Sequence, residues 1–138
     1  MKLNLILAVT AALACSIPTV AVAQSAEEKI VTLYRAAPGQ QVALLRWLAQ
    51  RDQIAAAAGV ARSQLYVHTN GDSWDYMLIA PQTTEAQDAA QDAEAKKIGA
   101  TTGPAAGIEL RRFIAHHTDT LVNGPTTAGE FLSKIGDK

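Results

Sequence analysis

The order in which strand-like and helix-like patterns follow one another constrains the fold of this chain more than any other feature. Residues 30–35 are mainly β-branched and aromatic and are followed by Ala37-Pro38-Gly39, which is typical of a strand that ends in a turn. Apolar residues in 40–58 then recur at steps of three and four, and Gly59 follows where a helix would end. This part of the chain predicts a strand and then an amphipathic helix.

The middle of the chain predicts a hairpin and a second helix. Two β-rich runs, 63–69 and 73–80, are separated by Asn70-Gly71-Asp72, whose Asn-Gly pair suits the positive φ angles of a tight turn. Thr84 and Gln87 have the spacing of a capping box, so we expect a helix over 85–98.

The remaining residues complete the topology. The Gly- and Pro-rich stretch 100–107 predicts a flexible connection, and a fourth strand is expected around 110–116. Thr127 and Glu130 form a second capping box that opens a short terminal helix. The order β-α-β-β-α-β predicts an α+β, ferredoxin-like fold with a four-stranded antiparallel sheet. Both helices are expected on one sheet face, so the other sheet face has to be buried by something other than these helices.

The N-terminal segment has the pattern of a secretory signal peptide. Met1-Lys2 is a positive start, a short apolar stretch follows, and Ala21-Val22-Ala23 is a small-x-small ending. We expect cleavage before Gln24, a single domain over 24–138, and a periplasmic or secreted protein that no longer contacts a membrane. The sequence around Cys15 also bears a distant similarity to a lipoprotein processing site, although Ala stands where a larger aliphatic residue is usual.

The composition of residues 24–138 excludes several classes of function. Cys15 is the one cysteine of the chain, so the mature domain has no thiol for a disulfide, a zinc–thiolate site or a nucleophile. Without Lys2 it carries 11 basic and 13 acidic side chains, which gives no electrostatic footprint for nucleic acid. P-loop, dinucleotide and G-x-S-x-G motifs are also lacking.

Strand alternation divides the sheet residues between two faces. The helix-covered face is expected to take an aliphatic set with one aromatic residue: Val31, Leu33, Leu65, Val67, Met77, Ile79, Phe113 and Ala115. The bare face then receives most of the amphipathic aromatics and histidines: Thr32, Tyr34, Tyr66, His68, Trp74, Tyr76, Leu78, Arg112, Ile114 and His116. Aromatics with a polar tip suit a surface that is partly dry, such as a dimer interface or a ligand cavity.

The run 30–80, with its Ala-Ala-Pro-Gly turn, Leu-rich helix and Trp-Asp-Tyr-Met-Leu-Ile strand, resembles the dimeric α/β-barrel superfamily. That superfamily includes stress-responsive barrel proteins, NIPSNAP-like proteins and antibiotic-biosynthesis-type monooxygenases. The resemblance implies that two sheets face one another across a two-fold axis and enclose a pocket on each side. Its members range from cofactor-independent oxygenases and polyketide cyclases to haem-handling enzymes, so the resemblance indicates an architecture and no single activity.

His68 and His116 are the candidate acid–base residues, because imidazole titrates near neutral pH. The other reading of both is a hydrogen-bonded interface histidine. His116 and His117 are adjacent and point to opposite faces, so they do not share a metal ion, and we expect no metal and no cofactor. A β-bulge in the fourth strand would exchange the places of His116 and His117.

Two functions follow from these patterns. The first is a homodimer whose pocket binds a small apolar or aromatic molecule without chemistry. Its ligand-binding residues would be Tyr34, Tyr66, Trp74, Tyr76, Arg112 and Ile114. The alternative is a cofactor-independent small-molecule enzyme, monooxygenase-like or polyketide-cyclase-like, with His68 or His116 as general base.

Overall fold

The computed structural model describes residues 27–136 and has the predicted element order with one additional helix, at residues 103–110. Strand β1 (Glu27–Ala36) and helix α1 (Gln41–Ala57) come first, and the hairpin β2 (Gln64–Val67) and β3 (Tyr76–Pro81) follows. Next are α2 (Glu85–Lys97), α3 (Gly103–Leu110), β4 (Ile114–Gly124) and α4 (Ala128–Lys134). The expected start of the domain at residue 24 and the signal peptide lie outside the described residues.

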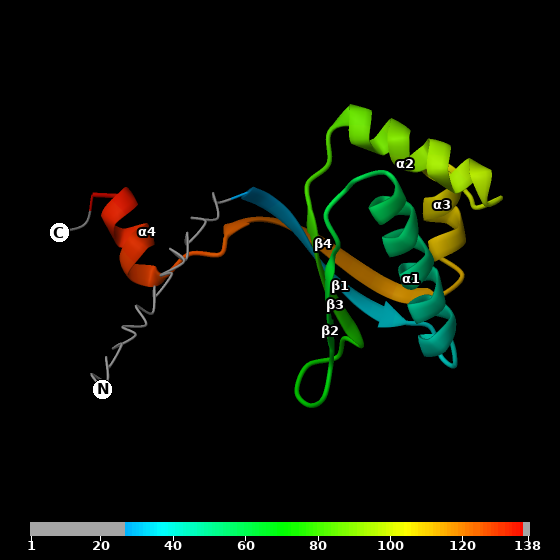
Figure 1. Cartoon of the computed structure of the whole chain (residues 1–138). Coiled ribbons are helices and arrows are strands. Elements are labelled where there is room, and N and C mark those ends of the chain that lie inside the picture. The colour runs from blue at the N-terminus through cyan, green and yellow to red at the C-terminus, as the bar shows by residue number, and fades with distance from the viewer. Residues whose placement is uncertain (1–26, 137–138) are drawn as a thin grey trace, which may run out of the picture.

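The four strands form one antiparallel sheet in the order β2-β3-β1-β4. This order and the helices between the strands make the fold ferredoxin-like, as the sequence predicts. Helices α1, α2 and α3 all lie on one side of the sheet, and α4 stands apart on the other side (Figure 1). We call the side with α1–α3 the helix side and the other the open face.

The core lies between the sheet and α1. Leu44 is fully buried and Leu48 nearly so, because the apolar spacing of α1 turns both toward the sheet. Tyr34, Ala36 and Tyr76 meet them from the central strands β1 and β3. Burial of these side chains holds α1 against the middle of the sheet.

Helix α3 was not predicted, since residues 100–107 were expected to form a flexible connection. Pro104 lies in its first turn, where the missing N–H costs no hydrogen bond. The helix is held from α1 by Arg51, which donates to the Thr101 carbonyl at 2.7 Å and reaches Glu109 at 3.4 Å. Trp47 Nε1 donates to the same Glu109 carboxylate at 3.1 Å. Contacts distant in sequence therefore order a segment whose composition predicts a loop.

The fourth strand begins later and runs further than expected. Leu110 belongs to α3, and β4 starts at Ile114 and pairs with β1 as far as Gly124. The two predicted capping boxes are both confirmed: the side chains of Thr84 and Thr127 accept from the backbone N–H of Gln87 and Glu130. No helix among residues 27–136 is long and apolar enough to cross a membrane.

Candidate functional site on the open face of the sheet

The predicted division of side chains between the two faces is wrong for β1 and β3. Tyr34 and Tyr76 are 7% and 6% exposed and pack on the helix side against α1. Thr32 and Leu78, which alternate with them, lie on the same side. Each ring spans the layer beneath α1, and the Tyr76 hydroxyl donates to the Gln41 carbonyl at 3.3 Å. These tyrosines are therefore core residues and do not line the open face.

The aliphatic set takes the place of the tyrosines. The register pairs Val31 with Ile79 and Leu33 with Met77, and all four side chains are on the open face. They are only partly buried in one copy of the chain. In β2 the predicted faces are correct: Tyr66 pairs with Met77 and shares its open face, while Leu65 and Val67 pair with helix-side residues.

A β-bulge decides the placement of the fourth-strand residues. The register shifts between Arg35 and Ala36, so that Arg35 faces His116 while Ala36 faces Ile114. Ile114 therefore packs with the core on the helix side, and its predicted place on the open face is wrong. His116 stays on the open face, as predicted. His117 pairs with Tyr34 on the helix side.

Arg112 is also displaced from its predicted position. It lies in the turn between α3 and β4, where its backbone N–H donates to the Glu109 carbonyl at 3.0 Å, and its side chain is exposed. A residue before the first strand pair has no place in the strand alternation, so Arg112 does not belong to either sheet face.

One depression of the open face is lined by side chains that can form hydrogen bonds, stack on a ring or transfer a proton. Its volume is about 220 Å³. Its lining combines apolar, basic, acidic and hydroxyl groups: Leu33, Arg35, Asp72, Ser73, Trp74, His116 and Thr118. Arg35 and His116 are direct cross-strand partners in β1 and β4. A guanidinium, an imidazole and an indole ring that line one depression can bind an oxygen-bearing aromatic molecule by hydrogen bonds and stacking.

His68 lies behind this depression, in the loop that joins β2 and β3. Its ring centroid is 4.9 Å from that of Trp74. The Nε2 atom of His68 is buried and has no hydrogen-bond partner among the described residues. The same loop places Gly71 beside it, with φ +121, where any added Cβ would come within 3.8 Å of that nitrogen. His68 thus packs against Trp74, and of the two candidate acid–base histidines His116 alone lines the depression.

A second depression lies at the other end of the open face. It has a volume of about 290 Å³. Its lining is mainly apolar: Lys29, Val31, Gln64, Tyr66, Ile79, Val122, Gly124 and Pro125. Of the six predicted ligand-binding residues, Trp74 lines the first depression and Tyr66 the second. Sequence reasoning missed Arg35, although its position two residues after Leu33 would have found it once the face of β1 was known.

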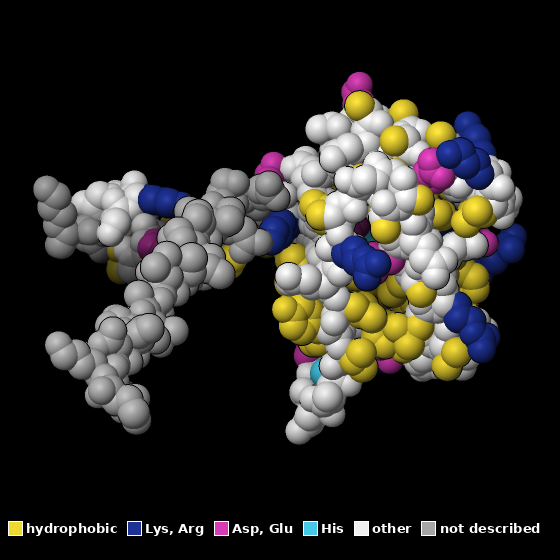
Figure 2. Space-filling view, in the orientation of Figure 1, with side chains coloured by type: hydrophobic (Ala, Val, Ile, Leu, Met, Phe, Trp, Pro, Cys, Tyr) yellow, Lys and Arg dark blue, Asp and Glu magenta, His cyan; other side chains and the backbone are white. Residues whose placement is uncertain are grey.

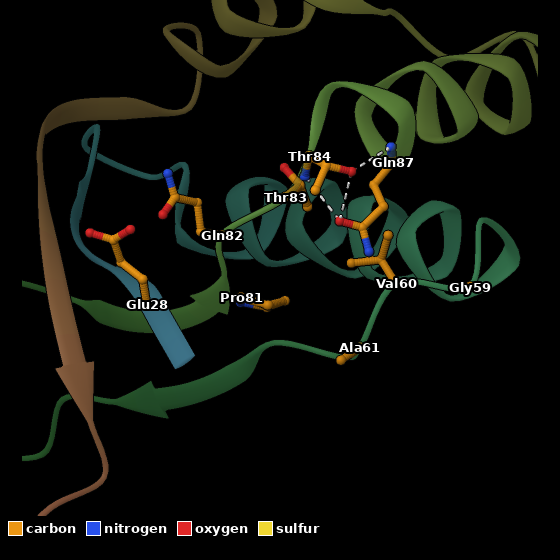
Figure 3. Close-up of a pocket in the computed structure, with 9 residues that line it drawn as sticks. All are labelled: Glu28, Gly59, Val60, Ala61, Pro81, Gln82, Thr83, Thr84 and Gln87. Carbon is orange, nitrogen blue, oxygen red and sulfur yellow. Dashed lines mark hydrogen bonds between the residues drawn. The ribbon is translucent and has the colours of Figure 1, made fainter. Parts of the chain in front are cut away.

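A larger hollow, of about 660 Å³, lies between the α1–β2 loop and the segment from β3 to α2 (Figure 3). Thr84 and Gln87 line it, but they bond to each other: the Thr84 N–H donates to Gln87 Oε1 at 2.9 Å. Glu28 is the charged residue of the lining. Two of its polar side chains, Thr84 and Gln87, thus cap α2 and are bonded to each other.

A polar cluster on the helix side of β1 and β4 was also not predicted. The Thr32 hydroxyl donates to Asp119 Oδ1 at 2.6 Å, and His117 Nε2 is 3.4 Å from Asp119 Oδ2. Burial raises the pKa of Tyr34 above its ordinary value, with a further rise from the charge of Asp119, while a hydrogen bond with Thr32 opposes both. None of the three hollows described above reaches this cluster, so its contacts join β4 to β1.

Metal ligands do not gather anywhere in the part of the chain that the structure describes. Among residues 27–136 no group of three or more His, Cys, Asp or Glu side chains is placed to hold an ion. The nearest approach is His117 with Asp119, a single pair. The described residues thus give a metal ion no protein site with the usual number of ligands.

Comparison with protein-family models and with curated proteins yields no match. Among solved structures, the chain is similar to a dimeric protein of unknown function with a ferredoxin-like fold from Bacteroides fragilis, with 14% identity, 70% of this chain and 95% of that chain covered, and a TM-score of 0.45. The chain is also similar to an uncharacterized NIPSNAP domain protein from Burkholderia xenovorans, with 13% identity, 73% of this chain and 96% of that chain covered, and a TM-score of 0.47. A third similar structure is a putative antibiotic biosynthesis monooxygenase from Chloroflexus aurantiacus, with 17% identity, 72% of this chain and 96% of that chain covered, and a TM-score of 0.45.

The fold is ferredoxin-like. The strand order of the chain itself establishes this. At these identities the likeness concerns the fold alone.

Proposed function

We propose that this chain is an exported homodimer in which two open faces pack together and enclose a pocket for a small apolar or aromatic molecule. The observation that carries the proposal is the aliphatic strip Val31, Leu33, Met77 and Ile79 on the face that no helix covers. A strip of this kind is typical of surfaces that become buried against a partner. Packing two such faces about 10 Å apart would bury it.

The pocket would be the depression with Arg35, Trp74 and His116. A second sheet laid over it would exclude water and leave the guanidinium and imidazole as its hydrogen-bond donors beside the Asp72 carboxylate and the Ser73 and Thr118 hydroxyls. An aromatic molecule with one carboxylate or phenolate oxygen fits this combination, because the indole offers a stacking face and the guanidinium offers hydrogen-bond donors.

A catalytic role for the same pocket is the second candidate, and the adjacency of Arg35 and His116 favours it. Imidazole can accept a proton from a carbon acid or phenol while the guanidinium stabilises the oxygen anion that results. Cofactor-independent proton transfer, as in a redox-neutral cyclisation, is the reaction class that needs only these groups, while an oxygenation would also consume O2 as the oxidant.

Replacement of Ile79 by Asp tests the dimer. Burying an Ile side chain contributes about 1.5–3 kcal/mol, and a carboxylate in an apolar interface is unfavourable, so we expect this variant to sediment as a folded monomer. Replacement of the exposed Ala89 of α2 by Asp is the matched control and should leave the dimer intact. A wild-type chain that sediments as a monomer at micromolar concentration would contradict the proposal.

A further inference from the structure

Helix α4 presents an apolar surface that contacts little of its own chain. Phe131, Leu132 and Ile135 are 55%, 43% and 62% exposed, and their spacing places them on one side of the helix. The hydrogen bonds that the structure gives for residues 126–136 all connect residues within this segment. In Figure 1, α4 stands clear of the sheet, in front of the open face. An amphipathic helix in this position requires a partner for its apolar side.

A second unpartnered apolar surface lies on the helix side, at the opposite edge of the sheet. We call it the β2 patch and define it as Leu65, Val67 and Val42, which are 42%, 60% and 58% exposed. Leu65 and Val67 pair with Leu78 and Tyr76 on β3, and Tyr76 in turn bonds to Gln41 beside Val42. The space-filling view shows a broad apolar area on the body of the molecule (Figure 2). Neither α2 nor α3 covers this edge (Figure 1).

The topology keeps these two surfaces of one chain apart. Helix α4 follows β4, which is one edge strand, whereas β2 is the other edge strand. The sideways separation of these edges is about 14 Å, three times the strand spacing. The β2 patch also faces the helix side, while α4 is on the open side and the link from Gly124 to Thr127 is short. The three residue steps of this link span at most about 11 Å, so the link cannot also pass around the sheet.

We propose that α4 of each copy packs on the β2 patch of the other copy, so that two arms clasp the homodimer. This inference rests on the proposed dimer through the open faces. Figure 1 shows the start of β1 and the end of β4 extending toward α4, and a second copy placed on the open face would lie beside them, between the body of the sheet and α4. The two surfaces match in chemistry, since the β2 patch is aliphatic and the α4 surface consists of one aromatic and two aliphatic side chains.

A mixing experiment with single cysteines tests the clasp. Cys15 is replaced by Ser in the full chain, Leu132→Cys is introduced in one preparation and Leu65→Cys in another, and a short bis-maleimide is added to the mixture. We expect a covalent dimer that contains one chain of each kind. The matched pair Ser133→Cys with Leu65→Cys should yield much less product, because Ser133 is on the opposite side of α4.

A second measurement uses charge. Phe131→Asp should raise the dissociation constant of the dimer at least about tenfold, since it removes a buried aromatic side chain, whereas Ser133→Asp should leave it nearly unchanged. The clasp would be overturned if the wild-type chain is a dimer but the mixture gives no product that links position 132 of one chain to position 65 of another. It would also be overturned if this link forms only when both cysteines are in one chain. Either result would leave the dimer through the open faces standing. A wild-type monomer would overturn both proposals.

Discussion

At the scale of single residues, the two adjacent histidines differ most clearly in surroundings. His116 lines the open-face depression beside Arg35, while His117 lies on the helix side near Asp119. We expect His116→Ala to weaken binding of an anionic aromatic probe, 1-anilinonaphthalene-8-sulfonate, by about tenfold, the effect of one lost charge-assisted or polar contact. His117→Ala is the control and should bind the probe as the wild type does. Equal effects of the two replacements on a folded dimer would contradict the assignment of the pocket.

Glu109 is the residue whose ionisation most affects the anchoring of α3. A hydrogen bond from Thr101 is the main cause that lowers the pKa of this carboxyl, and Trp47 and Arg51 add to it. A folded-state pKa below the unfolded value stabilises the fold at neutral pH, and this contribution is lost as the pH falls below about 4.3 through the folded pKa. Urea unfolding of Glu109→Gln should therefore show a deficit against the wild type at pH 7 that shrinks at pH 3.

Replacement of the exposed Glu85 by Gln is the control for this measurement. Its deficit should be small at both pH values. A deficit of Glu109→Gln that is the same at pH 7 and pH 3 would show that the charge of Glu109 does not contribute to anchoring.

At the scale of elements, the helices differ in how their first turns are satisfied. Thr84 caps α2 with its side chain, whereas Thr102 occupies the same position in α3 without a side-chain hydrogen bond. We therefore expect Thr84→Ala to lower the free energy of unfolding by about 1 kcal/mol and Thr102→Ala to change it much less. Chemical denaturation of both variants checks this, and equal losses would contradict the capping assignment.

At the scale of the whole molecule, the mature form depends on a segment outside the described residues. We propose export and cleavage between Ala23 and Gln24, because the segment has a positive start, a short apolar stretch and an Ala-x-Ala ending. The intact mass of the protein recovered from the periplasm or medium should correspond to residues 24–138. A mass that retains residues 1–23, or that includes a lipid on Cys15, would refute this proposal.

Local sequence patterns predicted the order of the elements apart from α3, and the ends of α1 and α2 to within one residue. Capping boxes at Thr84 and Thr127, the turn glycines and the helical period of α1 are local signals, and local hydrogen bonds and side-chain spacing are enough to read them. The bare sheet face follows from the order of these elements, and the predicted open-face position of His116 is correct, although the residues grouped with it by alternation in β1 and β3 lie on the helix side.

Contacts between residues distant in sequence set which face of each strand packs against the helices, and they order the 100–107 segment into helix α3. Both faces of β1 and β3 carry apolar side chains, so alternation separates two sets of residues without telling which set the helices cover. In the structure Tyr34 and Tyr76 pack under α1. The bulge between Arg35 and Ala36 reversed Ile114 relative to His116, and such a bulge depends on the partner strand. Helix α3 depends on Arg51 and Trp47, about 50 residues away or more along the chain, so no local pattern could predict it.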